Sequence, residues 1–255
     1  MDKIKLFSVN LYDYFSEVDN PKAMLVKEYC DDVRVKVDEY NKSRDVTIDP
    51  ELEYEWVDIT PELQEIVDTS VLGNLPKKYK FQLIADLVRY DYLYKNGGIY
   101  IDTDLELFTV DAIKYLVSCY QDSQVFGYGY TSGEFNKGRI FACNWIMVDQ
   151  KESRMAKYLY DGLVKWAMDH KDDVIDENFD HWQVWGYALY RDMPQQYYDM
   201  INPRLFQGYS WNKSWKKPDL DCRGLLGAHH FGWSEDALED ARPHLGVFYE
   251  MHCKN

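Results

Sequence analysis

The chain has no long apolar run and comparatively few basic side chains. Its 255 residues include 29 Lys and Arg against 44 Asp and Glu, giving a net charge of −15. This balance argues against nucleic acid and anionic membrane surfaces as partners. No segment approaches the roughly 18 consecutive apolar residues of a transmembrane helix, so no integral membrane segment is expected. The N-terminus becomes polar too soon for a signal peptide.

Cysteine is also scarce, with five residues at spacings that fit neither a disulfide framework nor a zinc site. They are typical of reduced thiols, and we expect a cytoplasmic protein. A hydrophobic content of 46% excludes a disordered chain. Because no repeat, linker or low-complexity run interrupts the sequence, residues 1–255 are expected to form a single domain.

Periodicity predicts strands that alternate with helices. Residues Ile4–Val9 and Leu52–Val57 are typical of strands, and apolar residues at helical spacing mark Lys22–Asn41 as a helix. Thr60 and Pro61 are typical of a helix N-cap and its first position. This alternation favours an α/β fold with a mostly parallel central sheet flanked by helices, which binds ligands at the carboxyl ends of its strands.

The most informative segment begins with a helix predicted for residues 79–95. Apolar residues cover most of its circumference, and Gln82, Asp86 and Arg89 share the remaining face. The sequence Asn96-Gly97-Gly98 should end this helix, because glycine takes the left-handed conformation at little steric cost.

A short strand, Ile99–Ile101, follows the glycines and ends in two carboxylates. In an extended segment Tyr100, Asp102 and Asp104 point to one side and the isoleucines to the other. Carboxylates held this close are costly without a positive charge between them. Mg²⁺ and Mn²⁺ bind through such carboxylates together with the phosphates of a substrate, so a divalent cation is expected here.

This segment carries the pattern D-x-x-R, then G-G-x-Y-x-D-x-D, with the residues Asp86, Arg89, Gly97, Gly98, Tyr100, Asp102 and Asp104. It resembles the signature of the DxD-containing glycosyltransferase sugar-binding family, glycosyltransferase family 32, and is similar to that of the clostridial glucosylating toxins. The resemblance implies a GT-A-like nucleotide-sugar-binding fold. Residues 1–108 would form the half that binds the donor. Residues 109–255 would bind the acceptor and close the metal site.

The resemblance also implies a role for each residue. Asp86 and Arg89 would contact hydroxyls of the donor sugar, and Arg89 would also meet the phosphate. Tyr100 would line the nucleotide pocket. Asp102 would hold the ribose or sugar and reach Mn²⁺ (or Mg²⁺) through water, while Asp104 would bind the metal directly. Without the neighbouring DxD, Asp86 and Arg89 would be interpreted as an ordinary ion pair within a helix.

Further candidates lie outside the signature. Phe7, Ser8 and Val9 end the first strand and would help bind the nucleotide, although the family's usual opening sequence is missing. Asn144, in a sequence similar to the family's second core strand, would face the donor sugar. His229 would be the third metal ligand, and the alternative is a core or capping histidine.

Lys213 belongs to a segment with three lysines in an otherwise acidic chain. An ammonium group there could neutralise the departing nucleotide diphosphate. The alternative is a solvated basic turn.

Together these features predict a metal-dependent, retaining glycosyltransferase. It would move a hexose from a nucleotide diphosphate sugar, with UDP favoured and GDP left open, to a hydroxyl of a glycan in polysaccharide or glycan biosynthesis. Asp86, Arg89, Asp102 and Asn144 would carry the reaction. The alternatives are a toxin-like enzyme that modifies a protein, a non-catalytic nucleotide-sugar-binding module and, more weakly, a metal-dependent hydrolase.

Overall fold

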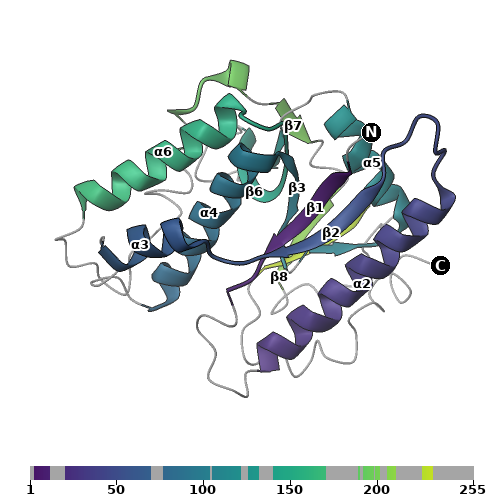
Figure 1. Cartoon of the computed structure of the whole chain (residues 1–255), viewed down its shortest axis with the longest axis horizontal. Coiled ribbons are helices and arrows are strands. Elements are labelled where there is room, and N and C mark those ends of the chain that lie inside the picture. The colour runs from purple at the N-terminus through teal and green to yellow at the C-terminus, as the bar shows by residue number, and fades with distance from the viewer. Residues whose placement is uncertain are drawn as a thin grey trace.

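The computed structural model describes residues 3–11, 21–69, 77–103, 105–121, 126–131, 140–170, 189, 192–197, 199–201, 206–210 and 226–231 (Figure 1). Within these ranges only the backbone is described for residues 21–29, 66–69, 77–81, 126–131, 140–145, 195, 199–201, 206–210 and 228–231. Two predicted site residues, Asp104 and Lys213, lie outside the described residues.

The larger sheet of the described chain has six strands in the order β2-β1-β3-β6-β5-β7. Their bounds are β1 Ile4–Val9, β2 Leu52–Val57, β3 Gly98–Ile101, β5 Phe126–Thr131, β6 Ile140–Asp149 and β7 Asp199–Ile201. β1 pairs in parallel with both β2 and β3, and β5 pairs in parallel with β7. Only β6 runs against its neighbours β3 and β5, so the sheet is mostly parallel.

Helices cover both faces of this sheet (Figure 1). The helices α3 (Pro61–Thr69), α4 (Lys77–Asn96) and α6 (Arg154–Asp169) lie on one face, and α2 (Pro21–Ser43) and α5 (Val110–Gln121) on the other. A short 3-10 helix, η3, spans Gln195–Tyr197. The predicted α/β class, with a mostly parallel central sheet flanked by helices, is therefore confirmed.

Side chains of the central strands alternate between two cores. Phe7 and Tyr100 join the core under α4 and α6, whereas Leu6 and Ile99 join the core under α2 and α5. This is the alternation expected of extended backbone. All four side chains are at most 3% exposed, so both faces of the central strands are sealed from water.

A second, three-stranded sheet continues directly from the signature. Its order is β4-β9-β8, with β4 Leu105–Leu107, β8 Phe206–Ser210 and β9 Gly227–Phe231. β9 is antiparallel to β4 and parallel to β8. The start of β4 and the ends of β8 and β9 therefore lie at one edge, immediately beside the DxD segment.

Local signals in the sequence predicted several boundaries correctly. Thr60 caps α3, since its Oγ1 accepts a hydrogen bond from the Leu63 N–H at 3.3 Å. Gly97 ends α4 with φ of +69°. A Cβ on Gly97 would also lie 2.6 Å from the Lys151 nitrogen, so close backbone packing independently requires glycine there.

The polar face of α4 differs from a solvated stripe. Asp86 and Arg89 are only 7% and 6% exposed, and the Gln82 Oε1 is buried without a hydrogen-bond partner in the described structure. α4 is thus buried nearly all round. The side chains of Asp86 and Arg89 face the protein interior, where buried polar atoms need partners.

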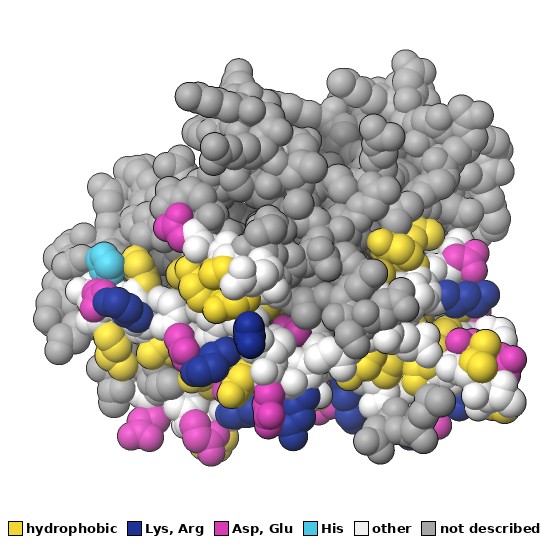
Figure 2. All heavy atoms as spheres, turned by 90° about the horizontal axis from the view of Figure 1, so that it is seen from above, with side chains coloured by type: hydrophobic (Ala, Val, Ile, Leu, Met, Phe, Trp, Pro, Cys, Tyr) yellow, Lys and Arg dark blue, Asp and Glu magenta, His cyan; other side chains and the backbone are white. Residues whose placement is uncertain are grey.

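The described surface seen from the α6 side mixes charges of both signs. Basic and acidic side chains are interspersed over this part of the face (Figure 2). Many are paired along one helix, as in Lys157–Asp161 and Lys165–Asp169 on α6. The described residues of this face therefore form no continuous basic patch (Figure 2).

No helix in the described ranges combines the length and hydropathy of a membrane span. The two cysteines whose side chains are described, Cys30 and Cys119, are buried free thiols.

Asp149 is a buried carboxylate at the end of β6. It is fully buried, accepts a hydrogen bond from Ser153, the N-cap of α6, and leaves its Oδ1 without a partner in the described part of the chain. Burial raises the pKa of Asp149 from 3.8 to about 7, although hydrogen bonds from Ser153 and two backbone N–H groups oppose the shift. Folding therefore favours the protonated carboxyl.

We expect Asp149→Asn to stabilise the protein at pH 8 but not at pH 5. Because the pKa of Asp149 is raised on folding, ionisation of this carboxyl lowers the free energy of unfolding of the wild type as pH rises from about 4 to about 7. Asparagine does not ionise, so it avoids this loss. Urea unfolding of both proteins at the two pH values measures the difference, with Asp161→Asn on exposed α6 surface as control. An equal effect of Asp149→Asn at both pH values would contradict the account.

Candidate functional site

The signature residues come together because α4 leads into β3 through a very short connection. α4 packs against β1 and β3, and Gly97 and Gly98, both with positive φ, reverse the chain between helix and strand. Asp86 and Arg89 on α4 are thereby placed over the carboxyl end of β3. This is where ligands bind in sheets of this kind.

Arg89 lies at the centre of the site and joins two carboxylates. One terminal nitrogen lies 3.2 Å from Asp86 Oδ1, and the other lies 3.3 Å from Asp102 Oδ1. Its Nε donates to the Ala85 carbonyl at 3.4 Å. The guanidinium thus holds both carboxylates in fixed positions, as its planar set of donors allows.

Tyr100 supports this arrangement from below. The Arg89 guanidinium lies over its ring at 4.4 Å from the ring centre, and the Tyr100 hydroxyl donates to Asp102 Oδ1. The centre of the Phe7 ring lies 5.4 Å from the centre of the Tyr100 ring. Tyr100 is only 3% exposed, so the structure places it under the site as a support for Asp102 and Arg89. Its predicted place in the wall of the nucleotide pocket stays a prediction.

The charges of this cluster are strongly coupled. Burial disfavours the charged form of Arg89, but Tyr100, Asp86 and Asp102 outweigh it and hold the Arg89 pKa well above its usual value. Burial also raises the pKa of Tyr100 well above its usual value, with Asp102 adding to the shift and Arg89 opposing it. Arg89 is thus positively charged and can hold both carboxylates. The Tyr100 hydroxyl stays protonated and can donate its hydrogen bond to Asp102.

Asp102 leaves the strand at the start of a turn. The Leu105 N–H donates to the Asp102 carbonyl at 3.2 Å, so the backbone bends between them and does not continue the strand. The expected alternation therefore holds for Tyr100 and Asp102, whose side chains are bonded to each other. Whether Asp104 follows this alternation stays a prediction, because it lies outside the described residues.

The metal prediction can be compared with the side chains that are described. No group of three or more potential ligands occurs among them, but Asp104 and the His229 side chain are not included. Asp102 keeps 21% of its side chain exposed while its Oδ1 accepts from Tyr100 and pairs with Arg89. The contact of Asp102 with a cation therefore stays a prediction.

The backbone of His229 is brought to the same place by the smaller sheet. His229 pairs with Leu105 on β4, the residue after Asp104. On its other side it pairs with Gly208, and β8 ends at Ser210, shortly before Lys213. Strand pairing thus places the predicted third ligand close in space to the DxD segment, although the two are far apart in sequence.

The three candidates of β1 are buried. Phe7 and Ser8 are inaccessible and Val9 is 6% exposed. The Ser8 hydroxyl donates to the Ile101 carbonyl at 2.9 Å, which fastens β1 to β3. Their predicted contact with the nucleotide remains untested. Asn144 lies on β6, two residues before Ile146, the partner of Ile101, so its backbone lies near the end of β3.

Two polar residues near the site have no role predicted from the sequence. Glu106 is 4% exposed on β4, between Leu105 and Leu107 of the core, and Gln82 lies one helical turn before Asp86 with a buried amide oxygen. A carboxylate between two leucines in an alternating strand is the signal that could have identified Glu106.

Comparison with known proteins gives one sequence match and a set of distant structural matches. The family model described as "Glycosyltransferase sugar-binding region containing DXD motif" matches residues 18–114. The search of curated proteins gave no match. The structure is similar to GlyE of Streptococcus pneumoniae TIGR4, with 10% identity, a TM-score of 0.47 and coverage of 96% of this chain and 64% of GlyE.

Two further structures are more distant. The apo form of GlyE shares 11% identity, with a TM-score of 0.44 and coverage of 90% of this chain and 55% of that one. PaToxG Glycosyltransferase shares 10% identity, with a TM-score of 0.39 and coverage of 74% and 66%. The chain thus spans less than two thirds of GlyE and about two thirds of PaToxG. Residues 18–114 are thus similar to the glycosyltransferase sugar-binding region that contains the DXD motif.

Proposed function

We propose that the protein transfers a hexose from a nucleotide diphosphate sugar, with UDP favoured, to a hydroxyl of a glycan, with retention of the anomeric configuration. The observation that carries this proposal is the buried Asp86–Arg89–Asp102 cluster at the carboxyl end of β3. A cluster built only for stability would gain little from two carboxylates on one guanidinium, because burying charges is costly.

The carboxylates are suited to hold the donor sugar. Asp86 and Asp102 accept hydrogen bonds, and sugar hydroxyls donate them. Arg89 fixes both carboxylates before the donor arrives, so little side-chain entropy remains to be lost on binding. Pre-set positions of this kind contribute to catalysis by orienting the reacting sugar.

The proposed cofactor is Mn²⁺ or Mg²⁺, held by Asp104, His229 and, through water, Asp102. Such a cation neutralises charge on the leaving diphosphate. The pairing of His229 with Leu105 supports this ligand set, because it brings two distant segments beside the DxD turn. Lys213 would add a further positive charge for the leaving group. Asn144 would contact the donor sugar from β6, and Phe7, Ser8 and Val9 would shape the base end of the pocket.

Transfer on one face of the sugar is the working hypothesis for retention. In it the leaving phosphate assists the incoming hydroxyl, and no side chain of the described structure needs to act as a nucleophile. Residues 1–108 would serve as the donor half of a single domain, and residues 109–255 would hold the acceptor. Strands of both halves share each sheet, which fits one folding unit.

A turnover assay tests the proposed activity. Purified protein is incubated with UDP-glucose, UDP-galactose, UDP-N-acetylglucosamine or GDP-mannose, with Mn²⁺, Mg²⁺ or EDTA. We expect metal-dependent release of free UDP from one of the UDP-sugars, and NMR of the released sugar should first show the retained anomer. Release that proceeds equally in EDTA, or an inverted anomer, would contradict the proposal.

Tyr100→Phe tests the support under the site, because it removes only the hydroxyl that donates to Asp102. By analogy with residues that orient ligands from behind, we expect donor affinity to fall about tenfold. The loss of stability should be about 1 kcal/mol, as for one hydrogen bond. Donor titration and urea unfolding measure the two effects.

Tyr40→Phe is the matched control. Tyr40 is 1% exposed and its hydroxyl donates to the Pro50 carbonyl, away from the site. It should lose similar stability and keep donor affinity. Equal donor affinity in both variants would show that the Tyr100 hydroxyl does not position Asp102.

A further inference from the structure

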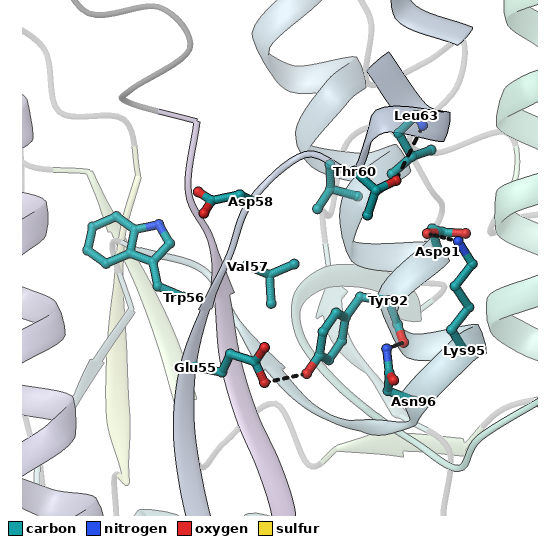
Figure 3. A pocket seen from close by; sticks show the side chains of 11 residues that line it. Glu55, Trp56, Val57, Asp58, Thr60, Leu63, Asp91, Tyr92, Lys95 and Asn96 are labelled. Atoms are coloured by element: carbon teal, nitrogen blue, oxygen red, sulfur yellow. Dashed lines mark hydrogen bonds and ion pairs between the residues drawn. The ribbon is translucent and has the colours of Figure 1, made fainter. Parts of the chain in front are cut away.

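A cavity of about 330 Å³ lies between the edge of the larger sheet and α4. It is built by the end of β2, the start of α3 and the second half of α4 (Figure 3). Its volume falls at the lower end of the range of small-molecule sites. The cavity is therefore too large for a single ion. The lining residues used below are Glu55, Val57, Asp58, Leu63, Val88, Asp91, Tyr92, Lys95 and Asn96.

The floor of the cavity is apolar. Val57, Leu63 and Val88 are each at most 7% exposed and belong to the core under α4. Tyr92 contributes its ring to the wall facing β2, and Trp56 lies on the opposite side of β2 from Tyr92 (Figure 3). A ligand here would therefore rest one of its faces on aliphatic and aromatic carbon.

The rim is rich in hydrogen-bond acceptors. Glu55 Oε2 accepts from the Tyr92 hydroxyl at 2.6 Å, and Asp58 Oδ1 accepts from Asn10 at 2.8 Å. Asp91 Oδ2 pairs with Lys95 at 2.7 Å. In each carboxylate one oxygen is thus held in place, and the second makes no bond to any described residue.

Asp91 is the most informative of these carboxylates. Its side chain is only 9% exposed and Lys95 holds one of its oxygens, so the second oxygen can accept a hydrogen bond from a ligand in the cavity. Because Lys95 and Lys5 already compensate Asp91 and Glu55, the cavity does not need a cationic ligand to balance them. It needs hydroxyl donors around an apolar centre.

Buried aromatic rings separate the cavity from the donor site. The Tyr92 ring lies 4.3 Å from Phe7, and Phe7 lies 5.4 Å from Tyr100, the residue that holds Asp102. Along α4, Asp91 follows Asp86 by about 8 Å of helical rise. Five residues also turn a helix by about 140°, so Asp91 and Asp86 lie on different faces of α4.

We propose that this cavity binds one pyranose unit of the glycan acceptor. A pyranose presents apolar faces and a rim of hydroxyl donors, which matches the aliphatic floor and the free carboxylate oxygens. The assignment of this sugar to an acceptor rests on the proposed transfer activity. The binding of a neutral saccharide to the cavity does not depend on that activity. The saccharide site and the transfer activity can therefore be disproved separately.

Titrations with neutral disaccharides test the proposal on the full chain. Maltose, cellobiose and lactose are each followed by amide chemical shifts in NMR, without donor or metal. We expect at least one to bind at millimolar concentration and to shift signals of Tyr92 and Asn96. Asp58→Ala and Asn96→Ala each remove one exposed polar side chain at the rim and should weaken this binding about three- to tenfold.

Asp161→Ala, an exposed carboxylate on α6, is the matched control and should leave disaccharide binding unchanged. Spermidine, titrated at low and high salt, probes for a cation site. The proposal would be overturned if no disaccharide bound, if the rim variants bound as the wild type does, or if spermidine alone bound and salt abolished it. If a disaccharide binds but UDP-sugars with Mn²⁺ do not, the saccharide site in the cavity is supported and the proposed transfer activity is overturned.

Discussion

Arg89→Met is expected to be the most damaging single substitution in the described site. It leaves Asp86 and Asp102 without their shared cation, and Asp86 is 7% exposed. Removing one partner of a buried ion pair costs about 3–5 kcal/mol. We therefore expect a loss of that size in the free energy of unfolding, measured by urea denaturation, together with loss of donor binding.

The chain offers a closely matched control in Arg34→Met. Arg34 pairs with Asp31 three residues earlier and lies 5.5 Å from the centre of the Tyr54 ring, but the pair is about half exposed. An exposed pair contributes at most about 1 kcal/mol. A comparable loss from both substitutions would contradict the claim that burial makes the Arg89 cluster costly to break.

Combining Asp86→Asn with Arg89→Met separates the charge effect from packing. Asp86→Asn removes one of the two carboxylates that lose their shared cation in Arg89→Met. We expect the double variant to be less destabilised than the sum of the singles by about 1–3 kcal/mol. A double variant that loses the full sum would show that Asp86 and Arg89 are not energetically coupled.

Asp102→Asn should have the largest effect on the activity for the least effect on the fold. The amide oxygen can still accept from Tyr100, and Arg89 keeps Asp86. In the proposed function this charge orients the cation and the donor, so its loss should lower donor affinity in Mn²⁺ about 100-fold. Donor titration followed by circular dichroism separates these effects.

Asp111→Asn provides the comparison for Asp102→Asn. Asp111 is an exposed carboxylate at the start of α5, paired with Lys114. It should bind the donor as the wild type does. If Asp102→Asn also kept wild-type affinity, the proposed role of Asp102 would be wrong.

Local features of the sequence predicted much of the structure of residues 1–108. Strands β1 and β2 have the expected bounds, and Thr60 and Gly97 cap helices as their residue types suggest. The D-x-x-R spacing predicted that Asp86 and Arg89 would meet, and they form an ion pair. These features succeed because helical periodicity and glycine stops act over a few residues.

Features that depend on distant segments were not predictable in the same way. The pairing of β4 with β9 joins Leu105 to His229, and no local pattern fixes such a register. The burial of Arg89 over Tyr100 depends on how α4 packs against β1 and β3. The cavity near Tyr92 likewise needs both β2 and α4 in place. Such features follow from tertiary packing, which overrides local preference.

The central claim is that a divalent cation joins the DxD segment to the donor diphosphate. Calorimetric titration of UDP-sugars into wild type and Asp104→Ala, each with and without Mn²⁺, tests it directly. We predict tight donor binding only in the wild type with Mn²⁺, and weak binding in the other three titrations. Donor binding that is equally tight without Mn²⁺ and in Asp104→Ala would contradict the account.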